Sequence, residues 1–134
     1  MYSLIIFEKS TPVGYTIIMT DKILQTVVET PEFTKKANEC MDDETKDDFI
    51  SFIAKNPLEG ELISGTGGAR KIRWQVEAHK GKRGGARIIY YYHDEGMPIF
   101  LFTAYKKNQK SDLTDSEKND LRKIIKMIAN AYGR

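Results

Sequence analysis

Apolar and polar residues alternate at helical spacing in the first half of the chain. Thr30, Pro31 and Glu32 place a capping hydroxyl, a proline for the first helical turn and an acid of that turn in series. This order is typical of a helix start. The pattern therefore predicts a helix from about Pro31 to Met41, and a short strand is allowed for ahead of it.

A second helix is predicted after the acidic turn at Asp42 and Asp43. Its apolar residues recur at helical spacing, and they are Phe49, Ile50, Phe52 and Ile53. Asn56-Pro57 ends the run, because the residue before a proline avoids helical backbone angles. The two predicted helices form a hairpin.

Three strands are expected beyond the glycine-containing connector of residues 60–68. Residues 71–76 alternate basic or polar with apolar side chains, the period of a strand with one polar face. The basic segment His79–Gly85 separates this run from Arg87–His93, a second run of β-branched and aromatic residues. Asp94-Glu95-Gly96 supplies turn residues before the third run, Pro98–Tyr105. The simplest arrangement is three consecutive antiparallel strands.

A last helix closes the chain. Thr114 and Glu117 have the spacing of a capping box, and the apolar stripe that follows is Leu121, Ile124, Ile125, Ile128, Ala129 and Tyr132. The fold class predicted is α+β, with two N-terminal helices, an antiparallel sheet of three to four strands and a C-terminal helix. The helices are expected to cover one sheet face and to leave the other for function.

Residues 1–24 do not fit this scheme and are treated as an N-terminal extension to a domain of residues 25–134. Two interpretations stay open. The segment Met19-Thr20-Asp21-Lys22 is a plausible alternative start of the polypeptide. The extension is otherwise a genuine added hairpin, formed by residues 4–7 and 15–19 around Pro12-Val13-Gly14.

Length and composition favour one domain. The 134 residues contain 40% hydrophobic and 30% charged residues, enough for one sizeable core.

Cys40 is the only cysteine, which excludes an intrachain disulfide and metal sites built on paired cysteines. Neither a signal peptide nor a membrane span is recognisable. A cytoplasmic protein without a metal or cofactor is expected.

The charges are segregated along the chain, although the net charge is only +2. Acids dominate residues 29–61. Between Arg70 and Lys110 the balance reverses, with ten Lys and Arg against three acids. If this region folds as one sheet, it presents a basic face that attracts a phosphate backbone.

Three motifs in this basic region resemble a known family. They are Gly65-Thr66-Gly67-Gly68-Ala69-Arg70-Lys71-Ile72-Arg73, Gly81-Lys82-Arg83-Gly84-Gly85-Ala86-Arg87-Ile88-Ile89-Tyr90-Tyr91, and Tyr105-Lys106-Lys107-Asn108 with the downstream Ser111-Asp112-Leu113. Together they resemble the HigB-type branch of the RelE toxins, from about Val27 to the final helix.

The resemblance implies a RelE-like fold and the toxin of a type II toxin-antitoxin system. It implies a metal-independent endoribonuclease that enters the A site of the 70S ribosome, cleaves mRNA there and inhibits translation. It also implies neutralisation by a cognate HigA-like antitoxin. In this family the 2'-hydroxyl attacks the neighbouring phosphorus, and lysine, arginine and often tyrosine replace the usual histidine pair.

By the same resemblance, the catalytic residues are Lys71, Arg73, Arg87 and Lys107. Arg87 is expected to hold the scissile phosphate, because a planar guanidinium can engage two oxygens at once. Period-two spacing places Lys71 and Arg73 on the same sheet face. Further RNA contacts are assigned to Arg70, Lys82, Arg83, Tyr91, Tyr105 and Lys106, and any of the three consecutive tyrosines 90–92 can stack on a base.

Other functions remain open at this point. His79 and His93 form a conceivable acid-base pair of the ribonuclease kind. A ParE-like toxin that poisons DNA gyrase shares the same family fold. A non-catalytic RNA-binding or ribosome-binding module would use the basic face for positioning alone.

Overall fold

The computed structural model describes residues 24–76 and 85–134. Two predictions fall outside these ranges. The choice between an added N-terminal hairpin and a later start concerns residues 1–23. Most of the predicted basic loop, including His79, Lys82 and Arg83, lies in residues 77–84.

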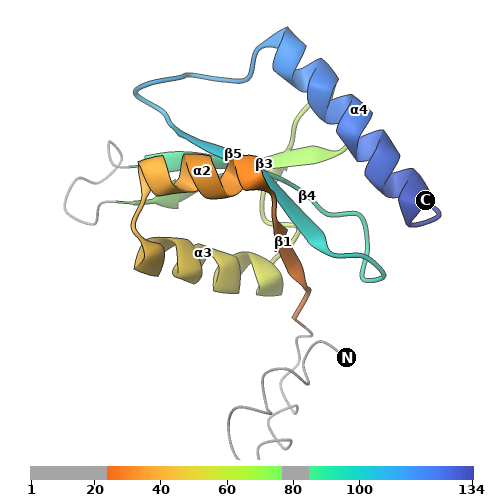
Figure 1. The fold of residues 1–134 in the computed structure, drawn as a ribbon, viewed down its shortest axis with the longest axis horizontal. Coiled ribbons are helices and arrows are strands. Elements are labelled where there is room, and N and C mark those ends of the chain that lie inside the picture. Colours follow the sequence, from red (N-terminus) through yellow and green to blue (C-terminus); the bar gives the residue numbers. More distant parts are fainter. Residues whose placement is uncertain (1–23, 77–84) are drawn as a thin grey trace, which may run out of the picture.

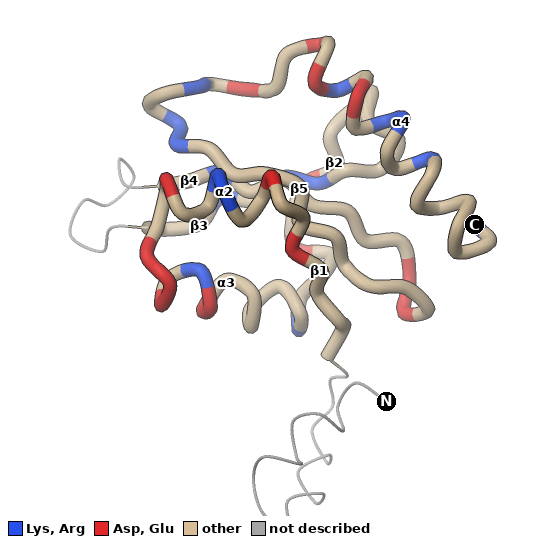
Figure 2. Tube along the Cα trace, viewed as in Figure 1, with Lys and Arg blue, Asp and Glu red and all other residues tan. Residues whose placement is uncertain are grey.

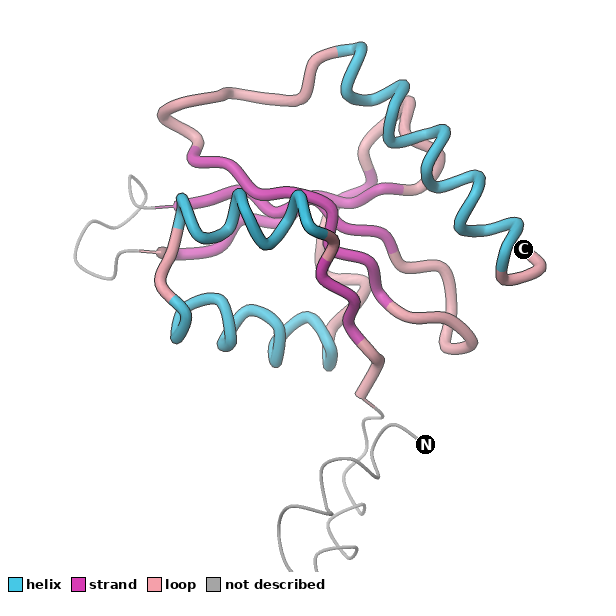
Figure 3. Tube along the Cα trace, in the orientation of Figure 1, coloured by secondary structure: helices cyan, strands magenta, loops and turns pink. Residues whose placement is uncertain are grey.

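A five-stranded mixed sheet forms the centre of the fold, in the order β1-β5-β4-β3-β2 (Figure 1). The strands are β1 (Val27–Glu29), β2 (Glu61–Leu62), β3 (Ala69–Gln75), β4 (Gly85–Tyr91) and β5 (Ile99–Lys106). β3, β4 and β5 are antiparallel neighbours, as predicted. Figure 3 shows the long connection from β5 to the last helix.

The sheet is larger than the three to four antiparallel strands expected, and β1 runs parallel to β5. β2 lies inside the glycine-containing connector of residues 60–68, where no strand was predicted, and pairs antiparallel with the start of β3. With three and two residues, β1 and β2 are too short to show a period-two pattern. Only pairing with a longer neighbour identifies them as strands.

The predicted helical hairpin is confirmed as α2 (Pro31–Cys40) and α3 (Asp43–Lys55). The Thr30 hydroxyl accepts a hydrogen bond from the Phe33 amide at 3.1 Å. Asp42 caps α3 in the same way by accepting from the Thr45 amide at 2.8 Å. The acidic turn is therefore a second N-cap, which satisfies amide groups that the helix itself leaves unpaired.

The last helix, α4 (Asp115–Ala131), begins with the predicted capping box between Thr114 and Glu117. Its position corrects one expectation. α2 and α3 pack on one face of the sheet and α4 on the other (Figure 1), so no face is left free of helices. A second apolar set on the strands, which includes Ile89, Tyr91 and Phe102, requires this cover.

Two apolar clusters consequently lie on the two sides of the sheet. The cluster under α2 and α3 contains Phe33, Phe49, Ile53, Ile88 and Leu101, all with no exposed surface. The cluster under α4 contains Ile63, Ala69, Ile89, Tyr91, Met97, Phe102, Leu113, Leu121 and Ile125. Because alternate strand residues point to opposite faces, β4 contributes to both clusters.

Tyr90 connects the sheet to the turn after α3. Its ring is fully buried, and its hydroxyl accepts from the Gly60 amide at 2.8 Å and donates to the Pro57 carbonyl at 2.8 Å. Burial raises the pKa of this phenol. Both hydrogen bonds hold the residues that lead into β2.

Tyr90→Phe should lower the free energy of unfolding by about 1–3 kcal/mol, because it leaves the buried Gly60 amide and Pro57 carbonyl unpaired. Urea unfolding followed by circular dichroism measures the change. Tyr105→Phe is the matched control, since the Tyr105 hydroxyl forms no hydrogen bond among the described residues. Equal stability of Tyr90→Phe and the unmodified protein would contradict the anchoring role.

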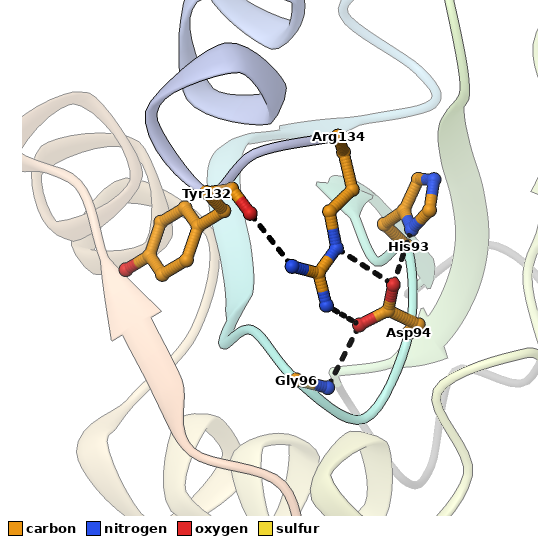
Figure 4. Close-up of polar contacts among 5 residues, drawn as sticks. All are labelled: His93, Asp94, Gly96, Tyr132 and Arg134. Carbon is orange, nitrogen blue, oxygen red and sulfur yellow. Dashed lines mark hydrogen bonds and ion pairs between the residues drawn. The ribbon is translucent and has the colours of Figure 1, made fainter.

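A second polar contact joins the end of the chain to the turn between β4 and β5 (Figure 4). Arg134 Nη2 and Nε donate to the two Asp94 carboxylate oxygens at 2.6 and 2.8 Å. Asp94 also contacts His93 Nδ1 at 2.7 Å and accepts from the Gly96 amide at 2.7 Å. These hydrogen bonds, that from Arg134 foremost, hold the pKa of Asp94 well below its usual range.

A pH dependence follows from this contact. The lowered pKa means that Asp94 stabilises the fold fully above the ordinary carboxyl pKa of about 3.9 and loses this contribution as the pH falls through the native value. The difference in unfolding free energy between the unmodified protein and Asp94→Asn should therefore be constant near neutrality and shrink below about pH 4. Urea titrations at several pH values measure it, with the exposed Asp48→Asn as control. A difference that is independent of pH would contradict the assignment.

Candidate active site

Two predicted catalytic residues and one predicted RNA contact lie in one row across the sheet. Arg73 of β3 is directly opposite Arg87 of β4, and Arg87 is directly opposite Tyr105 of β5. Residues paired this way have Cβ atoms about 5 Å apart and point to the same face. The face is that of α4, since Ile89 and Tyr105 belong to or pack against the α4 cluster.

Two arginines opposite each other on neighbouring strands repel and reduce the stability of a sheet. Arg73 is exposed and Arg87 half-buried. An anion placed between the two guanidinium groups removes the repulsion, and a phosphate can accept from both. A local arrangement that costs stability and fits an anion is typical of a functional site.

Lys71 lies on the same face, two residues before Arg73 on β3. Its Nζ is 3.8 Å from Asp112 Oδ1. Asp112 belongs to the connection between β5 and α4, where Figure 2 shows both basic and acidic residues. The connection thus adds an acid to the basic face.

The same connection contributes a lysine. Lys110 forms an ion pair with Glu117 of α4, and its Nζ lies 5.7 Å from the centre of the Tyr105 ring. Asp112 and Lys110 were not predicted as site residues. Ser111-Asp112-Leu113 was part of the recognised motif, so the sequence did carry a signal for this segment.

Tyr105 keeps its proton more firmly than an ordinary tyrosine. Burial raises the pKa of its phenol most, the Asp112 carboxylate raises it further, and the Arg87 guanidinium lowers it in part. The side chain remains half-buried rather than enclosed. A neutral phenol at the end of the arginine row can donate a hydrogen bond or a proton.

Three of the predicted RNA contacts lie elsewhere, namely Arg70, Tyr91 and Lys106. Arg70 is on the α3 side of the sheet, and its Nη1 donates to the carbonyls of Gly60 at 2.7 Å and Leu58 at 3.3 Å. Tyr91 is buried under α4 with 4% of its surface exposed. The structure does not bring any of the three side chains to the row of Arg73 and Arg87.

The two lysines after Tyr105 differ in position. Lys106 is two residues after Ala104 on β5 and therefore lies on the α2 side of the sheet. On that side, burial raises the pKa of the Cys40 thiol, and the positive charge of Lys106 lowers this pKa in part. Lys107 is exposed in the turn beyond β5. Lys107 is therefore adjacent to the row in sequence, but it extends past the sheet.

His93, one member of the histidine pair considered above, does not lie beside this row. His93 contacts Asp94 (Figure 4) and lies six residues beyond Arg87, about 20 Å along an extended chain. His79 lies outside the described residues. The row of Arg73, Arg87 and Tyr105 therefore does not include a histidine from the described part of the chain.

A groove of about 760 Å³ lies between α4 and the β1–β5 edge. Apolar side chains such as Phe100, Phe102 and Ile128 line it, together with four acids. Lys and Arg are missing from its lining among the described residues. A phosphate backbone would meet only negative charge there, so the basic face is the better candidate for binding one.

Within residues 24–76 and 85–134, no group of three or more His, Cys, Asp and Glu side chains is arranged to hold a metal ion. None of the helices in these ranges combines the length and apolar character of a membrane span.

A family model described as the RelE toxin of the RelE/RelB toxin-antitoxin system matches residues 25–133. The chain belongs to the RelE toxin family. A solved structure of an Arg-to-Ala double mutant of the E. coli toxin RelE, in the free state, is 14% identical to this chain. The alignment covers 65% of this chain and 87% of that chain, with a TM-score of 0.47.

Membership of the RelE toxin family confirms, at the level of the RelE toxins, the resemblance found in the three sequence motifs. The protein is thus a toxin of the toxin-antitoxin type, and its counterpart is an antitoxin. The α+β fold class predicted from the sequence is confirmed as well, with the corrections to the strand number and to the position of α4 given above.

Proposed function

We propose that this RelE-family toxin is a ribosome-dependent endoribonuclease of the HigB type that cleaves mRNA in the A site. The observation that carries the proposal is the row of Arg73, Arg87 and Tyr105 in register across three strands. Lys71 on the same face adds a third cation. The row offers fixed positive charge and a proton donor within one patch of sheet.

The chemistry requires these groups. A 2'-hydroxyl that has given its proton to water attacks the neighbouring phosphorus, and the bond from phosphorus to the 5' oxygen breaks. This places extra negative charge on a pentacovalent centre and on the departing 5' oxygen. Arg87, in the middle of the row, is suited to hold two non-bridging oxygens, and Arg73 supports it from β3. Tyr105, whose phenol stays protonated, is suited to give a proton to the departing oxygen.

The remaining catalytic assignment is Lys107. Its position in the exposed turn after β5 allows it to contact a phosphate that flanks the cleaved one. Lys82 and Arg83, which lie outside the described residues, are proposed to contact RNA in the same general way. This mechanism assigns the charge stabilisation to side chains and requires no metal ion.

The domain and the partners belong to the same proposal. Residues 25–134 are assigned as the toxin domain, and the family match to residues 25–133 supports this. The partners are the 70S ribosome with its mRNA in the cytoplasm, and an antitoxin of the HigA type. The basic face and the acid-lined groove offer an antitoxin two surfaces of different charge.

A reconstituted translation reaction tests the proposal. Purified toxin is added to a defined mRNA with and without ribosomes, and the mRNA 5' ends are mapped by primer extension. Cuts that require ribosomes are expected. Intact mRNA with folded toxin would contradict the proposal, and a gyrase supercoiling assay on the same sample would then test the ParE-like alternative.

A further inference from the structure

The connection between β5 and α4 places one carboxylate against the basic face. Asp112 Oδ1 lies 3.8 Å from Lys71 Nζ. The Asp112 carboxylate and the Arg87 guanidinium act in opposite directions on the pKa of the Tyr105 phenol, so each of them lies within electrostatic reach of that phenol. Asp112 therefore brings a negative charge to the place where a phosphate would be bound.

The contact between Asp112 and Lys71 is open to solvent. The side chains of Lys71 and Asp112 retain 33% and 51% of their accessible surface, and ion pairs this exposed are weak. Asp112 is also outside the apolar cores, in contrast to its neighbour Leu113. Loss of the ion pair should therefore have little effect on folding.

The residues on both sides of Asp112 have separate anchors. Lys110 is paired with Glu117, Leu113 is buried with 8% of its surface exposed, and Thr114 caps α4. The Asp112 side chain can therefore rotate away from Lys71 while the connection stays in place, and this rotation gives up only the hydrogen bond that Asp112 Oδ1 accepts from the Leu113 amide at 2.8 Å. Displacement of the carboxylate requires a change of rotamer and not the opening of a loop.

We propose that Asp112 is an internal competitor of RNA, whose carboxylate holds Lys71 in the free protein and is displaced by a phosphate of the bound RNA. The inference rests on the proposed function, since it requires the basic face to bind RNA. Carboxylate and phosphate are both partners of a lysine ammonium, so a phosphate that binds Lys71 must first displace the Asp112 carboxylate from it. Asp112 thus lowers the affinity of the site for RNA.

Asp112→Asn tests the competition. The amide keeps the oxygen that accepts from the Leu113 amide at 2.8 Å but removes the negative charge. Fluorescence anisotropy at low salt measures binding of a fully 2'-O-methylated RNA oligonucleotide, which cannot be cleaved through its 2' positions. The variant should bind about twofold to fivefold more tightly than the unmodified toxin. Asp120→Asn, an equal charge change on the groove side of α4, is the matched control and should bind like the unmodified toxin.

The same measurement in a Lys71→Ala background completes a double-mutant cycle. Because Asp112 acts through Lys71, Asp112→Asn should give no further gain in that background. Equal or weaker binding by Asp112→Asn in the unmodified toxin would overturn the proposal. A gain that persists without Lys71 would overturn it too, because it would reflect net charge and not competition.

Cleavage assays separate this proposal from the proposed function. At mRNA concentrations below saturation, Asp112→Asn should cleave faster in the ribosome assay, with an unchanged rate at saturation. A lower saturating rate would overturn the proposal, because Asp112 would then act as a catalytic group. If the unmodified toxin cleaves no mRNA, the ribonuclease function has failed, whereas the anisotropy cycle still reports on competition at Lys71.

Discussion

Arg87→Ala is expected to reduce ribosome-dependent mRNA cleavage by about 100-fold or more and to leave the fold intact. Arg87 stands between Arg73 and Tyr105 in the row across the sheet, so its loss removes the central charge opposite the reacting phosphate. Its removal also relieves repulsion from Arg73, and the melting temperature should stay the same or rise slightly. Primer extension and thermal unfolding on the same preparation measure both effects.

Two variants serve as controls for Arg87→Ala. Lys123→Ala removes a positive charge from an exposed position of α4 and should cleave like the unmodified toxin. Arg87→Lys keeps the charge but loses the planar group that binds two oxygens, so its activity should lie between the two. Full cleavage by Arg87→Ala would remove this residue from the mechanism.

Phe49→Ala is expected to destabilise the protein by about 3–5 kcal/mol, the largest effect on folding among the variants considered. Phe49 has no exposed surface, and its ring centre lies 5.2 Å from that of Trp74 in an edge-on contact. This contact packs α3 against β3, whose other face carries Lys71 and Arg73. The free energy of unfolding of a small domain is about 5–15 kcal/mol, so Phe49→Ala should remove a large part of it.

Phe52→Ala is the matched control for the core prediction. Phe52 contacts Trp74 at the same ring distance of 5.2 Å but is only half-buried. Its replacement leaves a smaller cavity and should cost clearly less stability than Phe49→Ala. Urea unfolding of the two variants side by side gives the comparison, and equal losses would show that the core is not centred on Phe49.

The candidate site was predictable from the sequence where its residues share one strand. Lys71 and Arg73 are two positions apart, which places both on one face of β3 by local geometry alone. Arg87 was predicted from the resemblance to a family motif. Its exact pairing with Arg73 and Tyr105 was not predictable, because strand register depends on contacts between residues far apart in the chain.

Asp112 is the clearest example of a site residue that could not be predicted from the sequence. In the sequence it is one polar residue in a connection between a strand and a helix, about 40 positions after Lys71. Its proximity to Lys71 depends on where α4 packs, since that position sets the path of the connection. Arg70 is the opposite case, a residue that was predicted to contact RNA but has a structural role. Its neighbours in the basic motif do not reveal that it donates to the carbonyls of Gly60 and Leu58.

The elements with local signals are predictable from the sequence: α2, α3 and α4 with their capping residues, the three long strands, and the motifs of the RelE toxin family. Three features are visible only in the folded chain: β1 joins β5 in parallel, α4 covers the second face of the sheet, and Asp112 faces Lys71. Caps and periodicity act within a few residues, whereas these three features arise from packing between segments distant in the chain.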